Sequence, residues 1–382
     1  MPDDPAAPSG VDAVTSNGLH RLSGPIEDDK SLMRWESLNN LLGPSRKEFQ
    51  MIDRPSYDAL TLDSRLAFNR ARIRYMAGEM IITTGTVLDL IKQFTKAHMM
   101  NDGSLIGRRG VLLSSPASTG KSTACLALIE YYLDRFDKDY PGAIAEGAIP
   151  AIYVSIPATR TVKGVLQRIA RFLALPFKNS DTETDLAAML QATLPAVSTK
   201  LIVLDEVQML GNAASLSRPA VNNLKDLTNY FEGTIVYSGL DLKDSELLQN
   251  DEGLQLKRRV FNVEVIDFTG KLTERKADEW SKIVAGFATE LPLYATSPQL
   301  LRAEADWLHG FTGGNIGTLK AVLLDAAASL ILEDKPEQET ITRGLLELSV
   351  RDYAAETGKT NTKPPAPLRG AGNRRRLGHA GN

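Results

Sequence analysis

Three residues, Gly120, Lys121 and Ser122, stand near the end of the stretch GVLLSSPASTGKST, which covers residues 110–123. A turn that ends in Gly-Lys-Ser can aim backbone N–H groups at phosphates, while the lysine reaches the β- and γ-phosphates and the hydroxyl ligates Mg²⁺. The apolar run before the turn predicts a strand, and the segment after it predicts a helix. We therefore predict a nucleotide-phosphate loop made of Ser115, Pro116, Ala117, Ser118, Thr119, Gly120, Lys121, Ser122 and Thr123.

The first position of this loop departs from the pattern G-x-x-x-x-G-K-[ST], because Ser115 replaces glycine. The change costs about 1 kcal/mol of strain if a positive φ is needed there, which is a penalty but does not exclude function. A second Gly-Lys-Thr, at residues 358–360, offers a comparison. No apolar strand precedes it, and Pro364 and Pro365 prevent a helix soon after it, so we expect no phosphate site there.

A second pattern that could do chemistry is KLIVLDEVQML at residues 200–210, where an apolar run ends in Asp205 and Glu206. A carboxylate at the carboxyl end of a buried strand is costly unless it has a task, and open α/β sheets bind ligands at this edge. We predict that Asp205, with Ser122, positions Mg²⁺ and that Glu206 activates an attacking water. The plainer interpretation is a strand followed by an acidic turn.

Two weaker signals follow. The stretch GTIVYSGLDL predicts a strand that ends near Ser238, whose hydroxyl could sense the γ-phosphate or the attacking water. In QLKRRVFNVEV, Arg258 and Arg259 precede a strand, and an arginine donated across a subunit interface stabilises charge on a transferred phosphoryl group. A serine at a strand end and a solvated basic turn are ordinary features, so both alternatives stay open.

Composition restricts the classes of protein that fit. Lys and Arg total 44 against 47 for Asp and Glu, so any contact with nucleic acid must come from a local patch. The single cysteine, Cys125, excludes an internal disulfide and a cysteine-based metal site, and four scattered histidines suggest no zinc cluster. No apolar run approaches the roughly 18 residues needed to span a bilayer, and the N-terminus lacks a signal-peptide pattern. We expect a cytoplasmic protein with no membrane contact.

The organisation along the chain predicts an α/β fold. The apolar runs GVLLSS, AIYVSI, KLIVLDE and GTIVYSG alternate with helix-like segments, which indicates a parallel sheet with helices on both faces. Residues 31–104 predict a helical N-terminal extension, 105–270 the nucleotide-binding core, and 271–356 a small helical domain. Residues 1–30 and the basic segment 357–382 hold too few apolar residues to fold, so we predict disordered tails.

The order of these motifs resembles that of the AAA+ ATPases. Within them, the chain is similar to the TniB/TnsC group, relatives of MuB, which are ATP-dependent regulators of bacterial DNA transposition. The resemblance covers roughly residues 50–356 and rests on SSPASTGKST, LIVLDEVQML, GTIVYSGLDL, LKRRVFNVEV, RIRYMAGEMIITTGTV and FTGGNIGTLKAVLLDAA. The first two motifs are general to NTPases, whereas the Tyr-Ser-Gly strand end and the last motif, where Gly-Gly-x-Ile-Gly opens a helix, point to transposition.

The resemblance implies ATP and Mg²⁺ as cofactors, hydrolysis of ATP to ADP and phosphate, and a helical lid after the AAA+ core. It also implies homo-oligomeric rings or filaments that form on duplex DNA without sequence specificity and hand the target to a DDE transposase. In such assemblies the loop after the second strand faces the DNA. Here Thr159, Arg160, Thr161 and Lys163 of SIPATRTVKG could donate to phosphates, and a solvated helix start is the alternative.

Two further positions depart from the group and keep other functions open. Gln208 stands where the group often has histidine, and Gly317 stands where many AAA+ lids carry an arginine, with Lys320 one turn on as a weak substitute. A slow or non-hydrolysing ATP-switched scaffold is therefore the second hypothesis. The third is another AAA+ DNA-transaction protein such as a helicase loader, although such proteins usually append a winged-helix domain, for which too few residues follow the lid.

Overall fold

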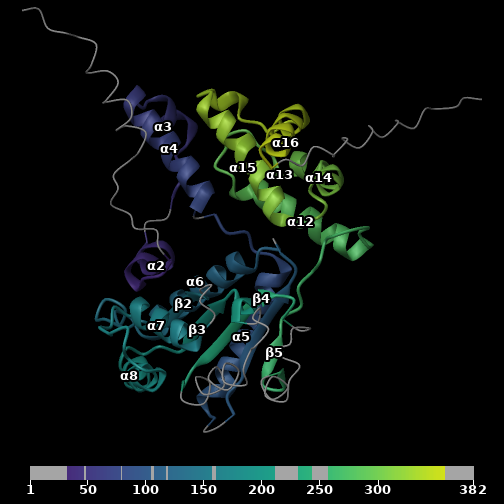
Figure 1. Cartoon of the computed structure of the whole chain (residues 1–382). Helices are drawn as coiled ribbons and strands as arrows, with labels where there is room; N and C mark the ends of the chain where they lie inside the picture. The colour runs from purple at the N-terminus through teal and green to yellow at the C-terminus, as the bar shows by residue number, and fades with distance from the viewer. Residues whose placement is uncertain are drawn as a thin grey trace, which may run out of the picture.

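The computed structural model describes residues 32–46, 49–78, 80–104, 107–117, 119–156, 161–210, 231–242 and 257–357. Within these residues the centre of the fold is a five-stranded sheet in the order β2-β3-β4-β1-β5 (Figure 1). Its strands are β1 (Gly110–Ser115), β2 (Ala151–Ser155), β3 (Leu201–Asp205), β4 (Thr234–Leu240) and β5 (Val260–Asn262). Every strand pair is parallel, which confirms the predicted α/β class.

The strands form where the sequence is apolar without interruption. Residues 111–113 of β1 and 201–204 of β3 are buried almost completely, so both faces of the sheet are covered. A strand covered on both faces needs apolar residues at successive positions, in contrast to the alternation of a half-exposed strand. The same property explains why these runs could be recognised from the sequence.

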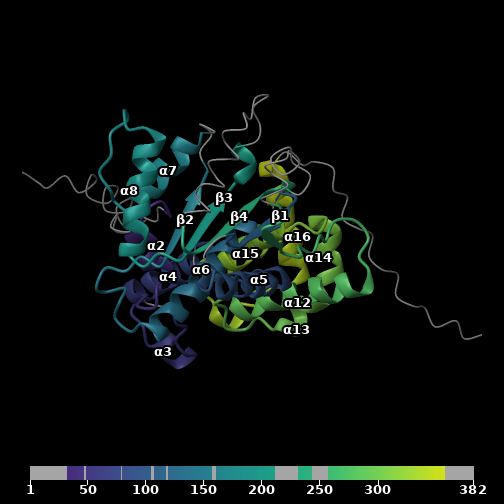
Figure 2. The same ribbon diagram turned by 90° about the horizontal axis from the view of Figure 1, so that it is seen from below.

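The core helices are α5 (Gly85–Asp102), α6 (Lys121–Asp139), α7 (Val162–Phe172) and α8 (Glu183–Ala196). Helix α5 packs across β1, β4 and β5, next to α6, which packs on β2, β3 and β4. The connections β1–α6–β2 and β2–α7–α8–β3 cross the sheet in opposite directions, and right-handed crossovers therefore place α6 and the α7–α8 pair on opposite faces. Figure 2 shows α7 and α8 beside β2, at one edge of the sheet.

The C-terminal helices form a second body, which we call the lid. They are α12 (Glu274–Glu290), α13 (Pro298–Ala303), α14 (Ala305–Thr312), α15 (Ile316–Leu332), the 3-10 turn η3 (Pro336–Gln338) and α16 (Arg343–Thr357). The lid has its own hydrophobic core, in which Trp280, Phe287 and Leu319 are buried. Helix α15 begins directly after Gly-Gly-Asn, as the sequence predicted, with the Asn315 Oδ1 atom accepting from the Thr318 N–H at 2.8 Å.

The N-terminal helices are divided between the two bodies (Figure 1). Helix α2 (Trp35–Leu42) packs on α6 and adds its apolar face to the core of the sheet. Helices α3 (Arg54–Asp58) and α4 (Leu62–Gly78) lie against the lid, and α4 contacts α15. The predicted domain limits stay a prediction, but the structure shows that this segment serves both bodies.

A buried ion pair ties α4 to the lid. The side chains of Arg72 and Glu339 are both 0% exposed, and Arg72 Nη1 donates to Glu339 Oε1 at 2.9 Å. Arg72 Nε also donates to the Pro292 carbonyl at 2.8 Å, and the Tyr294 N–H donates to Glu339 Oε2 at 3.0 Å. Because a buried charge without its partner is strongly destabilising, this pair keeps α4 on the lid.

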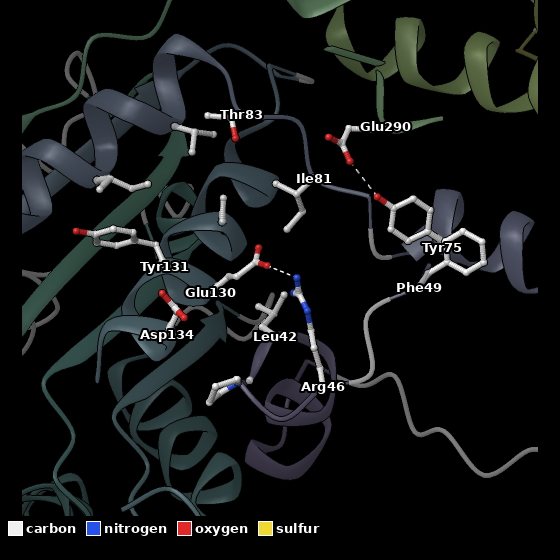
Figure 3. A pocket seen from close by; sticks show the side chains of 15 residues that line it. Leu42, Arg46, Phe49, Tyr75, Ile81, Thr83, Glu130, Tyr131, Asp134 and Glu290 are labelled. Carbon is white, nitrogen blue, oxygen red and sulfur yellow. Dashed lines mark hydrogen bonds and ion pairs between the residues drawn. The ribbon is translucent and has the colours of Figure 1, made fainter. Parts of the chain in front are cut away.

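A cavity of about 570 Å³ lies where α2, α4, α6 and the lid meet (Figure 3). On the core side, Arg46 pairs with Glu130 of α6. On the lid side, the Tyr75 hydroxyl donates to Glu290 Oε2 at 3.1 Å. None of the predicted site residues lines this cavity.

Of the predicted tails, 1–30 and 357–382, only Thr357 is described, as the last residue of α16; the second Gly-Lys-Thr also lies outside the described residues. Within the described part, no single helix is long and apolar enough to cross a membrane. Helices α14 and α15 together have the length and apolar composition of a spanning helix, by those two criteria only, and the chain bends by 116° between them.

Candidate nucleotide-binding site

The predicted phosphate loop connects the carboxyl end of β1 to the first turn of α6. Gly120 has φ 84° and precedes the helix, a left-handed conformation that glycine adopts without steric cost. Lys121 is 7% exposed, and its Nζ donates to the carbonyls of Ser115 at 3.2 Å and Pro116 at 2.7 Å. Burial lowers the pKa of Lys121, while the nearby carboxylates of Glu206 and Asp205 oppose that change. Both of these hydrogen bonds from the buried Lys121 ammonium go to carbonyl oxygens of the loop.

Ser115 takes part in the loop through its side chain. It is the last residue of β1 and does not have a positive φ, so the condition for the predicted strain is not met. Its Oγ lies 2.5 Å from the Thr119 Oγ1, and Thr119 donates to the Pro116 carbonyl at 3.1 Å. The serine therefore braces the turn that a glycine would leave unsupported. Ser118 lies outside the described residues.

The Asp205 carboxylate lies next to the loop and is 1% exposed. Its Oδ2 accepts from the Ser122 hydroxyl at 2.6 Å and from the Tyr153 hydroxyl at 2.8 Å. Tyr153 was missed by sequence reasoning, because only the register shows that this strand position shares a face with Asp205: Ser155 pairs with Asp205, and Tyr153 is two residues earlier. Burial and the Asp205 charge raise the pKa of Tyr153, so its hydroxyl stays a donor.

The oxygen donors of Ser122 and Asp205 fit Mg²⁺. Magnesium binds hard oxygen ligands, and proteins usually supply one or two of them while phosphates and water complete the set. Within the described residues no group of three or more His, Cys, Asp or Glu side chains could hold a metal. A metal held by Ser122 and Asp205 would have phosphate oxygens and water as its remaining ligands.

Glu206 has an unusual backbone conformation for a residue with a side chain. Its φ is 61°, in the left-handed region, which costs on the order of 1–3 kcal/mol and persists only where the surroundings hold it. The Glu206 N–H donates to Asp205 Oδ1 at 3.0 Å, which fixes the turn after β3. Among the charges that act on Lys121, the Glu206 carboxylate has the largest effect. The strained residue is thus held close to the place where phosphates would bind.

Ser238 lies between the loop strand and the Asp205 strand. Strand β4 separates β1 from β3, Leu113 pairs with Ser238, and Leu204 pairs with Tyr237, so Ser238 and Asp205 follow at the next positions. Ser238 is fully buried, and its Oγ makes no hydrogen bond of normal geometry within the described residues. Burial raises the pKa of the Cys125 thiol, and the nearby Ser238 side chain opposes that increase. We regard this as a weak contact with the S–H group.

A second cavity opens between the phosphate loop and the lid. Its lining residues come from the segment before α5, from the loop and α6, and from the lid: Met80, Ile82, Thr84, Thr86, Val87, Thr119, Gly120, Thr123, Ala124, Phe287, Ile316, Gly317 and Lys320. Lys320 Nζ donates to the Met80 carbonyl at 3.4 Å, a long hydrogen bond, and burial lowers the pKa of Lys320. The apolar members could not be found from the sequence, because they come from three separate segments.

The family model described as the bacterial TniB protein matches residues 72–268, which is more than half of the 382-residue chain. The chain belongs to the TniB family. This confirms the resemblance that the motifs indicated. Among curated proteins, none matches this TniB-family chain.

Solved structures confirm the AAA+ fold. The Aeropyrum pernix ORC2 protein, in its ADPNP-ADP complexes, is similar with a TM-score of 0.54 and 14% identity, over 73% of this chain and 71% of that chain. The ADP form of the same protein gives a TM-score of 0.50 and 13% identity, over 76% of this chain and 79% of that chain. At such identity the likeness shows the fold alone.

In the TniB-family chain, the predicted arginine pair lies at the other end of the sheet from the phosphate loop. Gly110 at the start of β1 pairs with Val260, and its N–H donates to the Arg259 carbonyl at 2.9 Å, so Arg258 and Arg259 flank the amino ends of the strands. Strand geometry, about 3.3 Å per residue, puts about 16 Å between Gly110 and Ser115. These arginines therefore do not reach the nucleotide site of their own chain.

The predicted DNA-contacting residues are only partly described. Thr159 and Arg160 lie outside the described residues. Thr161 caps α7, because its side chain accepts from the Gly164 N–H at 3.1 Å. Lys163 Nζ donates to the Asn179 carbonyl at 2.8 Å on the exposed surface. These contacts agree with the helix-start alternative, and a DNA contact by this loop stays a prediction.

Proposed function

We propose that this chain is an AAA+ ATPase that oligomerises on duplex DNA and regulates target selection by a partner DDE transposase. The observation that carries the proposal is the meeting of Lys121, Ser122, Asp205 and Glu206 at the carboxyl edge of one sheet. The similar ORC2 structures contain ADPNP and ADP, which supports a nucleotide as the ligand of this edge. Membership of the TniB family supports the link to transposition.

The phosphates of ATP would replace two carbonyls around Lys121. In the structure the ammonium donates to Ser115 and Pro116 of the loop, which are neutral partners. A phosphate offers charged oxygens, which add the attraction between opposite charges to the hydrogen bonds that the ammonium makes. The N-terminus of α6, which begins at Lys121, adds its own positive end.

The base of the nucleotide would enter the cavity between the loop and the lid. Met80 and Ile82 before α5 and Phe287 and Ile316 of the lid give this cavity apolar walls. Ligand pockets are mostly apolar with a few polar groups that fix orientation, and here Lys320 and the threonines are such groups. A nucleotide in this place would touch both bodies at once.

Hydrolysis would follow from the positions of the two carboxylates. Water attacks the γ-phosphorus, the bond between that phosphorus and the bridging oxygen breaks, and Glu206 accepts the proton from the water. Asp205 and Ser122 would hold Mg²⁺, which supplies positive charge to the phosphates when bound. Tyr153 orients Asp205 through its hydrogen bond.

The place of Arg258 and Arg259 supports the proposed oligomerisation. They lie about 16 Å from the loop of their own chain by strand geometry, so they would act on the nucleotide of a neighbouring subunit. An arginine in this role stabilises charge on the transferred phosphoryl group. The site would then be complete only in an assembly of two or more copies.

A slow or non-hydrolysing scaffold is the second candidate. The cavity between the loop and the lid has Gly317 and Lys320 in the region where many AAA+ lids carry an arginine, which favours this alternative. The two candidates differ in turnover of ATP, measured with and without duplex DNA, with Lys121→Ala as the control for contaminating activity. The ATPase predicts turnover that DNA stimulates, and binding of ATP without turnover contradicts it. Transposition reconstituted with a DDE transposase, chosen from the neighbouring genes if one is encoded there, tests the partner.

A further inference from the structure

Gln208 joins the predicted general base to the carboxyl end of β4. It lies in the 3-10 turn η1 (Val207–Leu210), which begins directly after Glu206. Its side-chain Nε2 donates a hydrogen bond to Glu206 Oε2, and its Oε1 accepts one from the Leu240 N–H at 2.9 Å. The amide therefore uses its donor on the carboxylate and its acceptor on a strand that lies 32 residues further along the chain.

Gly239 provides the space that this amide occupies. A Cβ atom at Gly239 would lie 2.3 Å from Gln208 Oε1, closer than real atoms approach. Gly239 does not have a positive φ, so glycine is not needed there for its backbone conformation. Gly239 thus leaves room for the amide of Gln208 because it has no side chain.

The hydrogen bond from Gln208 restricts the long side chain of Glu206, which could otherwise rotate. Fixed by Gln208, the carboxylate has one orientation relative to the phosphate loop. Gln208 does not line the cavity between the loop and the lid, so we expect no contact with a nucleotide base placed there.

We propose that Gln208 is a positioning residue, which fixes the Glu206 carboxylate for proton transfer and links its orientation to the end of β4. The proposal rests on the ATP hydrolysis proposed above. Because β4 also carries Ser238, a displacement of the strand end would be passed to the general base through this amide. The contribution is to turnover and leaves nucleotide affinity unchanged.

The test compares kcat for ATP with the Kd of a fluorescent ATP analogue in the full-length protein. Gln208→Ala should lower kcat about ten- to a hundredfold, the size expected when a reacting group is misplaced by about 1 Å, and leave Kd within about twofold. Gly239→Ala should do the same, because its methyl group would meet Gln208 Oε1 first and displace the amide, with Leu242 the next nearest side chain. Gly344→Ala is the matched control, since nothing lies within 4 Å of a Cβ there.

Two further variants separate positioning from a structural role. Gln208→Glu keeps the size and the acceptor but loses the donor and places a like charge beside Glu206, so kcat should fall at least as far as in Gln208→Ala. Gln208→His retains one donor and one acceptor in its neutral ring and should recover part of kcat.

The outcomes are distinguishable. Wild-type kcat in both Gln208→Ala and Gly239→Ala overturns the proposal and leaves the ATPase intact. Faster turnover in either variant also overturns it, since the amide would then restrain the base. A parallel loss of analogue binding indicates a structural role. A wild-type protein that binds ATP but does not hydrolyse it overturns both this proposal and the hydrolytic function.

Discussion

Lys121 and Glu206 lie at the same edge of the sheet but have different tasks in the proposed reaction. Lys121→Ala removes the buried ammonium that would meet the phosphates, so binding of ATP should become very weak. Glu206→Gln keeps the size of the side chain but removes the base, so binding should persist while hydrolysis stops. Isothermal titration with ATP and a phosphate-release assay measure the two effects. Equal loss of binding in both variants contradicts the assigned roles.

Lys320 is the cation that the lid brings to the nucleotide cavity. The Lys320 side chain is half-buried and makes one long hydrogen bond to the Met80 carbonyl, so a phosphate would be a better partner than the one it has. Lys320→Met should weaken ATP binding about tenfold, a loss of about 1.4 kcal/mol, and affect ADP less. Lys320→Arg should keep most of the affinity. If Lys320→Met binds ATP like the wild type, the lysine only contacts the segment before α5.

At the scale of single residues, the sequence predicts the functional residues that lie close together along the chain. The loop and the Asp-Glu pair each come from one contiguous pattern, and the structure places them together. Tyr153 acts through a hydrogen bond that depends on strand register and has no local pattern. Gln208 lies within the Asp-Glu motif, but its bond to the Leu240 N–H could not be predicted from the sequence. The effect of serine in place of glycine at position 115 could not be predicted from the sequence, because the contact between the Ser115 and Thr119 hydroxyls forms only in the folded loop.

Among the elements, α4 depends on the lid through the Arg72–Glu339 pair. Arg72→Met leaves Glu339 buried without its partner, which should lower the free energy of unfolding by about 3–5 kcal/mol. Urea denaturation measures this change. Arg70→Met on the same helix is the control, because Arg70 is exposed and its replacement should change stability by less than about 0.5 kcal/mol. Similar stability of the two variants would mean that the buried pair contributes little.

The strands show where element prediction succeeds and where it fails. Four apolar runs became β1 to β4 almost at their predicted limits, because burial on both faces leaves a continuous apolar signal. The stretch QLKRRVFNVEV predicts a strand after Arg259, and β5 covers only Val260–Asn262. Beyond it, Val263 packs in the core of the sheet and Phe268 in the core of the lid, so the apolar residues serve two bodies. Likewise, the partner of Arg72 is 267 residues away and has no local signal.

At the scale of the assembly, Arg258 and Arg259 are expected to act on a neighbour. Arg258→Ala or Arg259→Ala should lose turnover while ATP binding by the monomer survives. Mixing that variant with Glu206→Gln protein should restore some activity, because one type of mixed interface holds both an intact glutamate and an intact arginine. Phosphate release at several mixing ratios measures the rescue. No rescue at any ratio, with mixed assembly verified, counts against action in trans.

DNA binding should depend on assembly, because the chain carries a net charge of −3. Each phosphate contact adds a slope of about −0.9 to log K against log salt on B-DNA, so several subunits in a row bind where one does not. Binding should therefore need ATP and weaken steeply with salt. Arg160→Ala with Lys163→Ala should weaken it, whereas Lys282→Ala on the lid should not. Anisotropy at two salt concentrations tests this, and ATP-independent binding lost only on removal of residues 358–382 would refute the loop assignment.

The attachment of α3 and α4 to the lid also changes the mechanics of the molecule. The chain passes between the sheet and the lid three times, between α2 and α3, between α4 and α5 and between β5 and α12, where a lid built only from C-terminal helices would be reached once. A body held by a single link can rotate in every direction, whereas several links restrict the directions in which it can rotate. Spin labels near the links should keep their distances to the sheet when ATP is added. Labels on α13 or α16, away from the links, should move the most.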